Sequence, residues 1–188
     1  MPLPVKIRRI VLTGFMGAGK STVGPLLAQR LSWNFLDSDV AVEARTGVTV
    51  AEIFARQGEA AFRALEAEAI GRNVLRENLV LALGGGAIET ESTRRLLAGL
   101  DCGCVLFLDA PLDVLVTRCL AQPAAAERPV LADREGLLRR YNARLPYYRE
   151  AHLTIMTAGL TPHAVVATIL RVLEQRCAAE AAEGVPTR

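Results

Sequence analysis

Short apolar runs alternate along this chain with longer segments in which apolar residues recur every three or four positions. The short runs, rich in β-branched residues, predict buried strands, and the longer segments predict helices. The predicted strands are residues 9–13, 33–36, 79–83, 105–109 and 153–156. Strands separated by helix-length segments indicate βαβ units, so we expect one parallel sheet with helices on both faces.

Capping patterns mark several of the predicted helix ends. Thr49 and Glu52 have the T-x-x-E spacing of a capping box, and Pro111 and Pro162 each stand in the first turn of a predicted helix. The apolar spacing of the last helix stops at Cys177, so residues 177–188 are predicted to be a frayed tail.

A glycine loop directly follows the first predicted strand. Residues 14–21 read GFMGAGKS, a G-x-x-x-x-G-K-S pattern, and a helical pattern follows it. Strand, glycine loop and helix in this order place backbone N–H groups around phosphate oxygens. Lys20 adds a full positive charge, and the Ser21 hydroxyl can bind Mg²⁺. The sequence therefore predicts a nucleoside triphosphate site, without separating a GTPase, an ATPase and a small-molecule kinase.

Two carboxylates follow the second predicted strand. Alternation in an extended segment would place Asp37 and Asp39 on the same side. Parallel strands end at one edge of the sheet, so both should lie near the phosphates. There, one carboxylate could lie near the magnesium ion and the other could accept a proton from a substrate hydroxyl. The alternative is that Asp39 only caps the following helix, and the pattern does not decide between the two.

Further candidate groups lie later in the chain. Gly84, Gly85 and Gly86 follow the third predicted strand, where they expose backbone N–H groups to a ligand. Arg63 lies in a segment of helical register, and Arg128 and Arg144 stand close to prolines. The alanine- and proline-rich residues 121–129 are either a plain surface loop or a mobile lid that excludes water.

Composition narrows the class of protein. The chain has 188 residues with 22 basic and 20 acidic side chains, a net charge of +2, and no basic block. We therefore expect a single domain, 1–188, that has no nucleic acid partner. No apolar stretch has the length of a membrane span or of a signal core, which predicts a cytoplasmic protein without a membrane partner.

The four cysteines show no metal-binding or C-x-x-C spacing, which fits a reducing compartment. Cys102 and Cys104 begin an apolar run, and we expect both to be small buried hydrophobes.

The order of these motifs resembles that of the shikimate kinases. The resemblance covers residues 8–175 and includes the phosphate loop, D-S-D, G-E-x-x-F-R, G-G-G-A, R-P-V-L and R-L-P-Y-Y. It implies an α/β fold of the P-loop NTPase type, with three αβα layers and a five-stranded parallel sheet of order 2-3-1-4-5.

The resemblance also implies how ATP and Mg²⁺ would be held. Ser21 would bind Mg²⁺, and Asp37 would act on it through water. Arg118 would pack against adenine, and Arg128, on a lid at residues 120–135, would approach the phosphates. The groups implied to hold ATP are Gly17, Ala18, Gly19, Lys20, Ser21, Thr22, Arg118 and Arg128.

For the substrate, the resemblance implies shikimate bound mainly by residues 37–65. Asp39 would be the base for the 3-hydroxyl, Arg63 and Arg144 would grip the carboxylate, and Gly84, Gly85 and Gly86 would offer backbone groups. Guanidiniums do provide the planar paired donors that a carboxylate needs. The implied catalytic residues are Lys20, Asp39 and Arg128, and the reaction is transfer of the γ-phosphoryl of MgATP to shikimate by a monomer.

Three alternatives remain. The chain could be a kinase for another small hydroxylated acid, such as gluconate, or a non-catalytic relative that only binds nucleotide. A nucleotide-dependent switch is disfavoured, because the N-K-x-D element of guanine-specific switches is absent.

Overall fold

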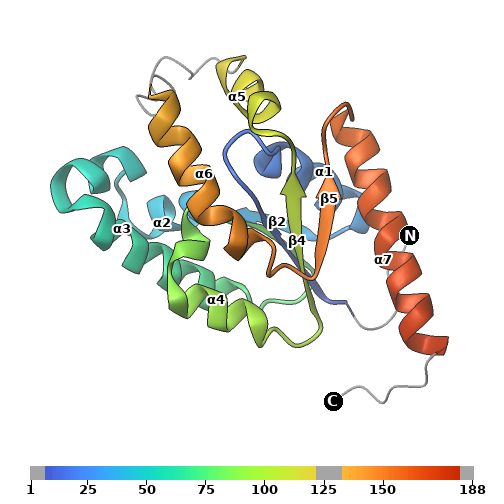
Figure 1. The fold of residues 1–188 in the computed structure, drawn as a ribbon. Coiled ribbons are helices and arrows are strands. Elements are labelled where there is room, and N and C mark those ends of the chain that lie inside the picture. Colours follow the sequence, from blue (N-terminus) through green and yellow to red (C-terminus); the bar gives the residue numbers. More distant parts are fainter. Residues whose placement is uncertain (1–6, 122–132, 183–188) are drawn as a thin grey trace.

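The computed structural model describes residues 7–121 and 133–182. Its five strands form one sheet in the order β2-β3-β1-β4-β5, and every neighbouring pair is parallel, as predicted (Figure 1). The strands are β1 (Arg9–Thr13), β2 (Asn34–Asp37), β3 (Leu79–Ala82), β4 (Gly103–Asp109) and β5 (Leu153–Met156). The helices are α1 (Lys20–Leu31), α2 (Ser38–Thr46), α3 (Val50–Asn73), η1 (Ala87–Glu89), α4 (Glu91–Ala98), α5 (Leu112–Leu120), α6 (Arg134–Tyr148) and α7 (Pro162–Ala182).

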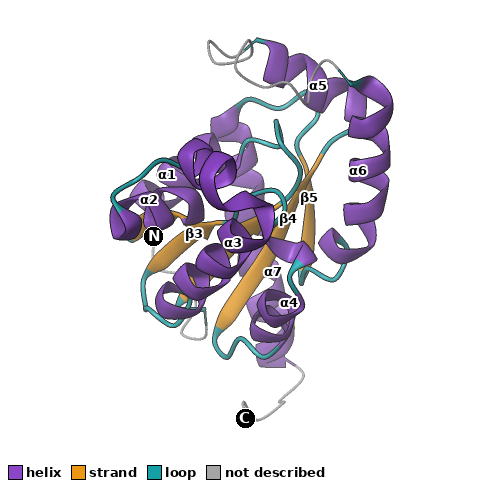
Figure 2. Cartoon of the chain, turned by 90° about the vertical axis from the view of Figure 1, so that its left-hand side faces the viewer, coloured by secondary structure: helices purple, strands orange, loops and turns teal. Residues whose placement is uncertain are grey.

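Helices cover both faces of the sheet, so the described residues form three layers (Figures 1 and 2). Helices α1 and α7 pack side by side on one face, and α3, α4 and α6 lie on the other. The central strands are mainly apolar, because a parallel strand covered on both sides has no solvent face. All four residues of β3 are buried, for example.

A second, smaller apolar cluster holds the substrate-side helices together. Val42 of α2 packs with Ile53, Phe62 and Ala69 of α3. These helices follow β2 directly, so their packing positions Asp39 and Arg63 against the sheet. Helix α3 is kinked at Gly58, whose φ of 82° is accessible mainly to glycine.

The predicted capping patterns are largely confirmed. Thr49 and Glu52 form a reciprocal capping box at the start of α3. The Thr161 hydroxyl accepts a hydrogen bond from the Ala164 amide, and α7 begins at Pro162. Pro111 was predicted to lie in the first turn of a helix. It is instead the N-cap residue of α5, with a non-helical ψ of 144°, and the helix begins at Leu112.

Three other predictions need correction. The expected extended alternation ends at Asp37, because Ser38 and Asp39 are helical. The open alternative that Asp39 caps α2 is excluded, since Asp37 is the cap. Cys102 is exposed, because it occupies a left-handed turn, φ 51°, just before β4. Helix α7 continues past Cys177 to Ala182, although the apolar spacing stops there. None of the helices in the described ranges is long and apolar enough to cross a membrane.

The capping box makes a prediction about stability. Replacing Thr49 by alanine removes the acceptor for the Glu52 amide, which lies 3.2 Å from the Thr49 hydroxyl. We expect the free energy of unfolding to fall by about 1 kcal/mol in urea denaturation. Thr49→Ser keeps the hydroxyl and should stay close to the wild type. Equal losses in both variants would contradict a capping role.

Candidate functional site

The phosphate loop lies between β1 and α1, at the carboxyl edge of the sheet. Gly14, Gly17 and Gly19 all have positive φ. A Cβ on Gly14 would lie 2.5 Å from the Leu108 carbonyl oxygen, and one on Gly17 would collide with the Leu115 carbonyl oxygen. These two glycines are therefore needed both for backbone conformation and for close packing against β4 and α5.

The loop offers several unused donors to an anion. Within the described residues, the amides of Gly17, Gly19, Lys20 and Ser21 have no acceptor. Two amides of the predicted set do have partners inside the loop and α1. The Ala18 amide donates to the Phe15 carbonyl at 3.2 Å, and the Thr22 amide donates to the Gly19 carbonyl at 3.0 Å.

Lys20 folds back over this loop. Its Nζ donates to the carbonyl oxygens of Gly14 and Phe15 at 2.6 and 3.2 Å. Burial lowers the pKa of Lys20 to about 8, against the opposing effect of Asp37 and Asp39. Lys20 therefore remains mainly charged at neutral pH, and the negative charge of a bound polyphosphate would raise its pKa again.

Asp37 links the phosphate loop to the substrate side. Its Oδ2 accepts a hydrogen bond from the Ser21 hydroxyl at 3.0 Å, and its Oδ1 accepts one from the Asp39 amide at 3.0 Å. One carboxylate thus caps α2 and orients the hydroxyl predicted to bind metal. No cluster of three or more His, Cys, Asp or Glu side chains in the described part of the chain could hold a metal ion by itself.

Asp39 lies in the first turn of α2 with an oxygen turned inward. Its Oδ1 is buried and has no hydrogen-bond partner among the described residues. Burial, aided by the charges of Glu66 and Asp37, raises the pKa of Asp39 to about 6. Asp39 is therefore ionised at neutral pH and remains a free acceptor.

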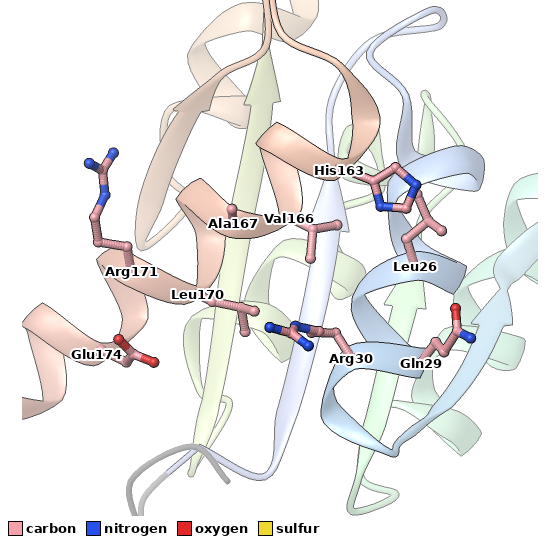
Figure 3. Close-up of a pocket in the computed structure, with 9 residues that line it drawn as sticks. All are labelled: Leu26, Gln29, Arg30, His163, Val166, Ala167, Leu170, Arg171 and Glu174. Carbon is pink, nitrogen blue, oxygen red and sulfur yellow. The ribbon is translucent and has the colours of Figure 1, made fainter. Parts of the chain in front are cut away.

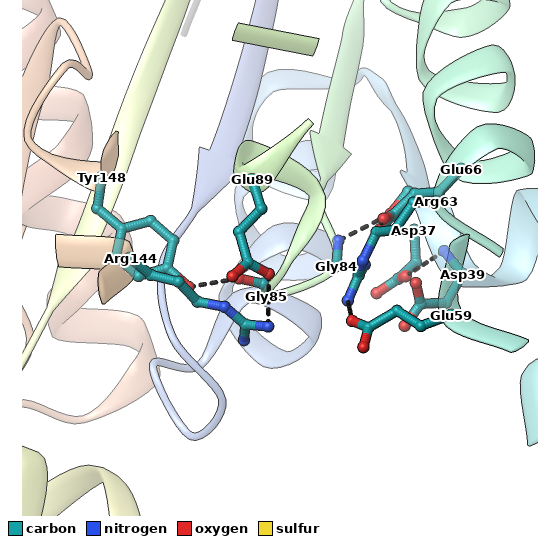
Figure 4. A network of polar contacts seen from close by, with 11 residues as sticks. Asp37, Asp39, Glu59, Arg63, Glu66, Gly84, Gly85, Glu89, Arg144 and Tyr148 are labelled. Carbon is teal, nitrogen blue, oxygen red and sulfur yellow. Dashed lines mark hydrogen bonds and ion pairs between the residues drawn. The ribbon is translucent and has the colours of Figure 1, made fainter. Parts of the chain in front are cut away.

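A buried carboxylate that the sequence reasoning missed organises the neighbouring groups (Figure 4). The side chain of Glu66 is 1% exposed, and its Oε2 accepts from Arg63 Nη1 at 2.6 Å. Its Oε1 accepts from the Ser38 hydroxyl at 3.3 Å, and the Ser38 oxygen in turn accepts from the Gly84 amide at 2.8 Å. Glu66 follows Arg63 by one helical turn, and this i,i+3 spacing was the available signal.

Gly84 and Gly86 leave room for the charged groups beside them. A Cβ on Gly84 would collide with Glu66 Oε1 and lie 2.8 Å from Asp39 Oδ1. A Cβ on Gly86 would collide with Arg63 Nη2 and lie 2.9 Å from Arg144 Nη2. The two guanidiniums predicted to grip one carboxylate therefore meet at Gly86, although they come from α3 and α6.

Arg144 is held from several sides. Its Nη2 donates to Glu89 Oε2 at 2.7 Å, and its guanidinium lies 5.9 Å from the centre of the Phe15 ring. Tyr148, one turn along α6, donates from its hydroxyl to the Gly85 carbonyl at 2.5 Å. Burial raises the pKa of Tyr148, so it remains a neutral donor. Sequence reasoning missed Glu89 and Tyr148, whose partners are distant in the chain.

Arg118 closes a separate hollow next to the phosphate loop. Its Nη1 donates to the Thr157 hydroxyl at 2.8 Å and its Nη2 to the Thr157 carbonyl at 2.6 Å. The hollow has a volume of about 240 Å³, and Gly17, Leu160 and Pro162 also line it. A planar guanidinium fixed over a largely apolar surface is suited to packing against a nucleobase.

The phosphate loop and the carboxylates share one cavity of about 400 Å³. Its lining residues are Met16, Gly17, Gly19, Lys20, Ser21, Thr22, Asp37, Asp39, Leu83, Gly84 and Gly85. Arg63 and Arg144 are not among these lining residues. They lie next to the cavity around Gly86, where acidic side chains occupy them.

A larger hollow of about 620 Å³ lies elsewhere, between α1 and α7 (Figure 3). Leu26 and Arg30 line it from α1, and His163, Val166 and Leu170 line it from α7. None of the predicted site residues lines this hollow. Arg128 and most of the predicted lid lie outside the described residues.

Comparisons with known proteins identify the family of this chain. The sequence model of the shikimate kinase family matches residues 16–174. A shikimate kinase of Symbiobacterium thermophilum is 43% identical over 171 residues, covering 89% of this chain and 97% of the relative. One of Psychrobacter cryohalolentis is 38% identical over 183 residues, covering 95% and 96%. This chain belongs to the shikimate kinase family.

Solved structures of shikimate kinases have the same fold. Shikimate kinase from Acinetobacter baumannii in complex with shikimate has a TM-score of 0.82 and 36% identity, covering 90% of this chain and 94% of the other. A gluconokinase from Sinorhizobium meliloti has a TM-score of 0.60 at 18% identity, which shows a shared fold alone. As a shikimate kinase family member, the protein is an ATP-dependent kinase with a hydroxyl group as acceptor.

The position of Gly86 makes a prediction about substrate binding. Replacing Gly86 by alanine would push a methyl group into Arg63 Nη2 and toward Arg144 Nη2, so the two guanidiniums could no longer meet there. We expect the KM for shikimate to rise at least about tenfold, the effect of losing one strong charged contact. The KM for ATP should change little in steady-state assays.

Gly71→Ala serves as the control, because a Cβ on Gly71 meets nothing within 4 Å. It should leave both KM values unchanged. A Gly86→Ala enzyme with the wild-type KM for shikimate would contradict the convergence of the two arginines.

Proposed function

We propose that the cavity binds MgATP and shikimate side by side and transfers the γ-phosphoryl group to the 3-hydroxyl of shikimate. The observation that supports this most is the meeting of Arg63 and Arg144 at Gly86, next to the unpartnered oxygen of Asp39. Donors for a substrate carboxylate and an acceptor for a substrate hydroxyl thus lie beside a phosphate loop. That combination fits a small hydroxylated acid better than a neutral sugar.

The ATP would lie along the first turn of α1. The unused amides of Gly17, Gly19, Lys20 and Ser21 would donate to the phosphate oxygens, and the helix N-terminus would add partial positive charge. Lys20 would exchange the loop carbonyls for phosphate oxygens. Arg118, fixed by Thr157, would cover the base.

The donors near the loop fit Mg²⁺. Mg²⁺ keeps several waters and takes few protein oxygens together with substrate phosphates. The Ser21 hydroxyl and the Asp37 carboxylate, 3.0 Å apart, offer such oxygen donors, and Asp37 would act through water. When bound, the ion would neutralise charge on the transferring phosphoryl group.

The shikimate would lie between the glycine turn and α2. Its carboxylate would pair with the guanidiniums of Arg63 and Arg144, and the backbone N–H groups of Gly85 and Gly86 would approach its ring. The Gly84 amide already donates to the Ser38 hydroxyl oxygen, so Gly84 would contribute space for the substrate instead of a donor. Arg63 keeps its orientation because Glu66 holds Nη1. The hydroxyl would then point along the sheet edge toward the phosphate loop.

Asp39 would accept the proton of the attacking hydroxyl. The environment that raises its pKa to about 6 makes the carboxylate a stronger base, and Asp39 is still ionised at pH 7. Most of the remaining catalysis would be positioning and charge stabilisation by Lys20, Mg²⁺ and Arg128. The predictions of a monomer and of a cytoplasmic location remain predictions.

A coupled assay of ADP release tests the proposed function. With MgATP present, shikimate should raise ADP release far above the rate without it, and gluconate should not. Phosphorylation of gluconate in preference to shikimate would favour the other small-acid kinase. No acceptor-dependent release with either acid would favour a non-catalytic relative.

Asp39→Asn tests the proposed base. We expect turnover to fall by about 10²- to 10⁴-fold, because an amide cannot accept the proton, while ATP affinity stays near normal. A variant that kept more than about a tenth of wild-type turnover would exclude Asp39 as the base.

In the wild type, kcat/KM for shikimate should drop below pH 6, where Asp39, with its pKa raised to about 6 by burial, becomes protonated.

A further inference from the structure

Three carboxylates already occupy the two guanidiniums that meet at Gly86 (Figure 4). Arg63 pairs with Glu66 at 2.6 Å and with Glu59 at 3.1 Å, and Arg144 pairs with Glu89 at 2.7 Å. A substrate carboxylate must therefore share these arginines with acidic side chains of the protein or displace one of them.

The three acids differ in how easily they can leave. Glu66 is 1% exposed and is also held by the Ser38 hydroxyl, so it stays in place. Glu59 is 59% exposed, but its departure leaves Arg63 paired with Glu66. Glu89 is 38% exposed, and within the described residues its carboxylate has no ion-pair partner other than Arg144. Displacing Glu89 thus frees a whole guanidinium.

The geometry of Arg144 shows why Glu89 would compete with a ligand. Its Nε is buried and has no acceptor among the described residues, so the accessible donors are on Nη1 and Nη2. Nη2 faces Gly86 at 2.9 Å from a Cβ position there, and the same Nη2 donates to Glu89. Glu89 therefore holds the donor that an acid bound between Arg63 and Arg144 would use.

We propose that Glu89 is an internal stand-in for the substrate carboxylate, which occupies Arg144 until an acidic substrate displaces it. This inference rests on the proposed function and adds a specificity-determining residue to it. With Glu89 in place, the site is not left with an unpaired buried cation. Only a ligand that brings its own negative charge can replace Glu89 without leaving Arg144 unpaired. Glu89 thus makes binding weaker but confines it to carboxylates.

Glu89→Gln tests the proposal, because the amide keeps the size and loses the charge. We expect the KM for shikimate to fall about fivefold, the effect of one partly exposed ion pair. The value of kcat should stay within about twofold, and the KM for ATP should not change. Glu89→Ala removes the same ion pair by truncating the side chain, and it should also lower the KM for shikimate.

Glu91→Gln is the matched control. Glu91 is close in sequence and pairs with Arg95 at 2.5 Å on the exposed surface. The Glu91→Gln variant has the same charge change as Glu89→Gln but does not contact the site. Its kcat and its KM values for shikimate and ATP should therefore equal those of the wild type. A fall in KM in this control would attribute the effect to overall charge and overturn the proposal.

Binding of benzoate, a ring carboxylate with no hydroxyl, separates this proposal from the proposed function. Calorimetric titration should show tighter benzoate binding in Glu89→Gln than in the wild type, whether or not phosphoryl transfer occurs. Unchanged or weaker binding of benzoate, with an unchanged or higher KM for shikimate, would overturn the role of Glu89 alone. A wild type that failed to phosphorylate shikimate would overturn the proposed function.

Discussion

The arrangement of the site depends on one buried ion pair, between Glu66 and Arg63. A carboxylate that is 1% exposed is stable only when its oxygens are paired, and Glu66 has Arg63 on one oxygen and Ser38 on the other. Ser38 belongs to α2 and also accepts from Gly84 after β3. This single carboxylate therefore joins α2, α3 and the glycine turn, and it orients the guanidinium that meets Arg144.

The parallel sheet explains why these groups can meet. The strands β1, β2 and β3 pair in parallel, so the phosphate loop, Asp37 and the glycine turn all follow strand ends at the same edge. Glycine at 84 and 86 then removes the side chains that would fill the space between the strands and the charged groups. Opposite charges are thereby concentrated at one edge, with Asp39 Oδ1 beside Gly84 and the two guanidiniums beside Gly86.

Much of this could be predicted from the sequence. The strand positions, the phosphate loop and the capping box depend on local patterns, and all were recognisable. Local patterns were less reliable at boundaries, where the extended segment expected to include Asp39 ends at Asp37 and Cys102 proved to be exposed. In both cases the local backbone decides the outcome: α2 begins at Ser38, and Cys102 lies in a left-handed turn before β4.

The partners of the charged residues could not be predicted in the same way. Glu89 and Arg144 lie far apart in the chain, as do Arg118 and Thr157, and only the fold brings each pair together. The pairing of Arg63 with Arg144 in one site came from the family resemblance and not from any spacing in this sequence. Glu66 was within reach of local reasoning, because it follows Arg63 by one helical turn.

A crystal structure of the protein with shikimate bound tests the convergence of these groups most directly. We expect the shikimate carboxylate to contact the guanidiniums of both Arg63 and Arg144 beside Gly86, with a hydroxyl within hydrogen-bond distance of Asp39. Shikimate bound with its carboxylate away from both arginines, or with no hydroxyl near Asp39, would contradict the proposed site.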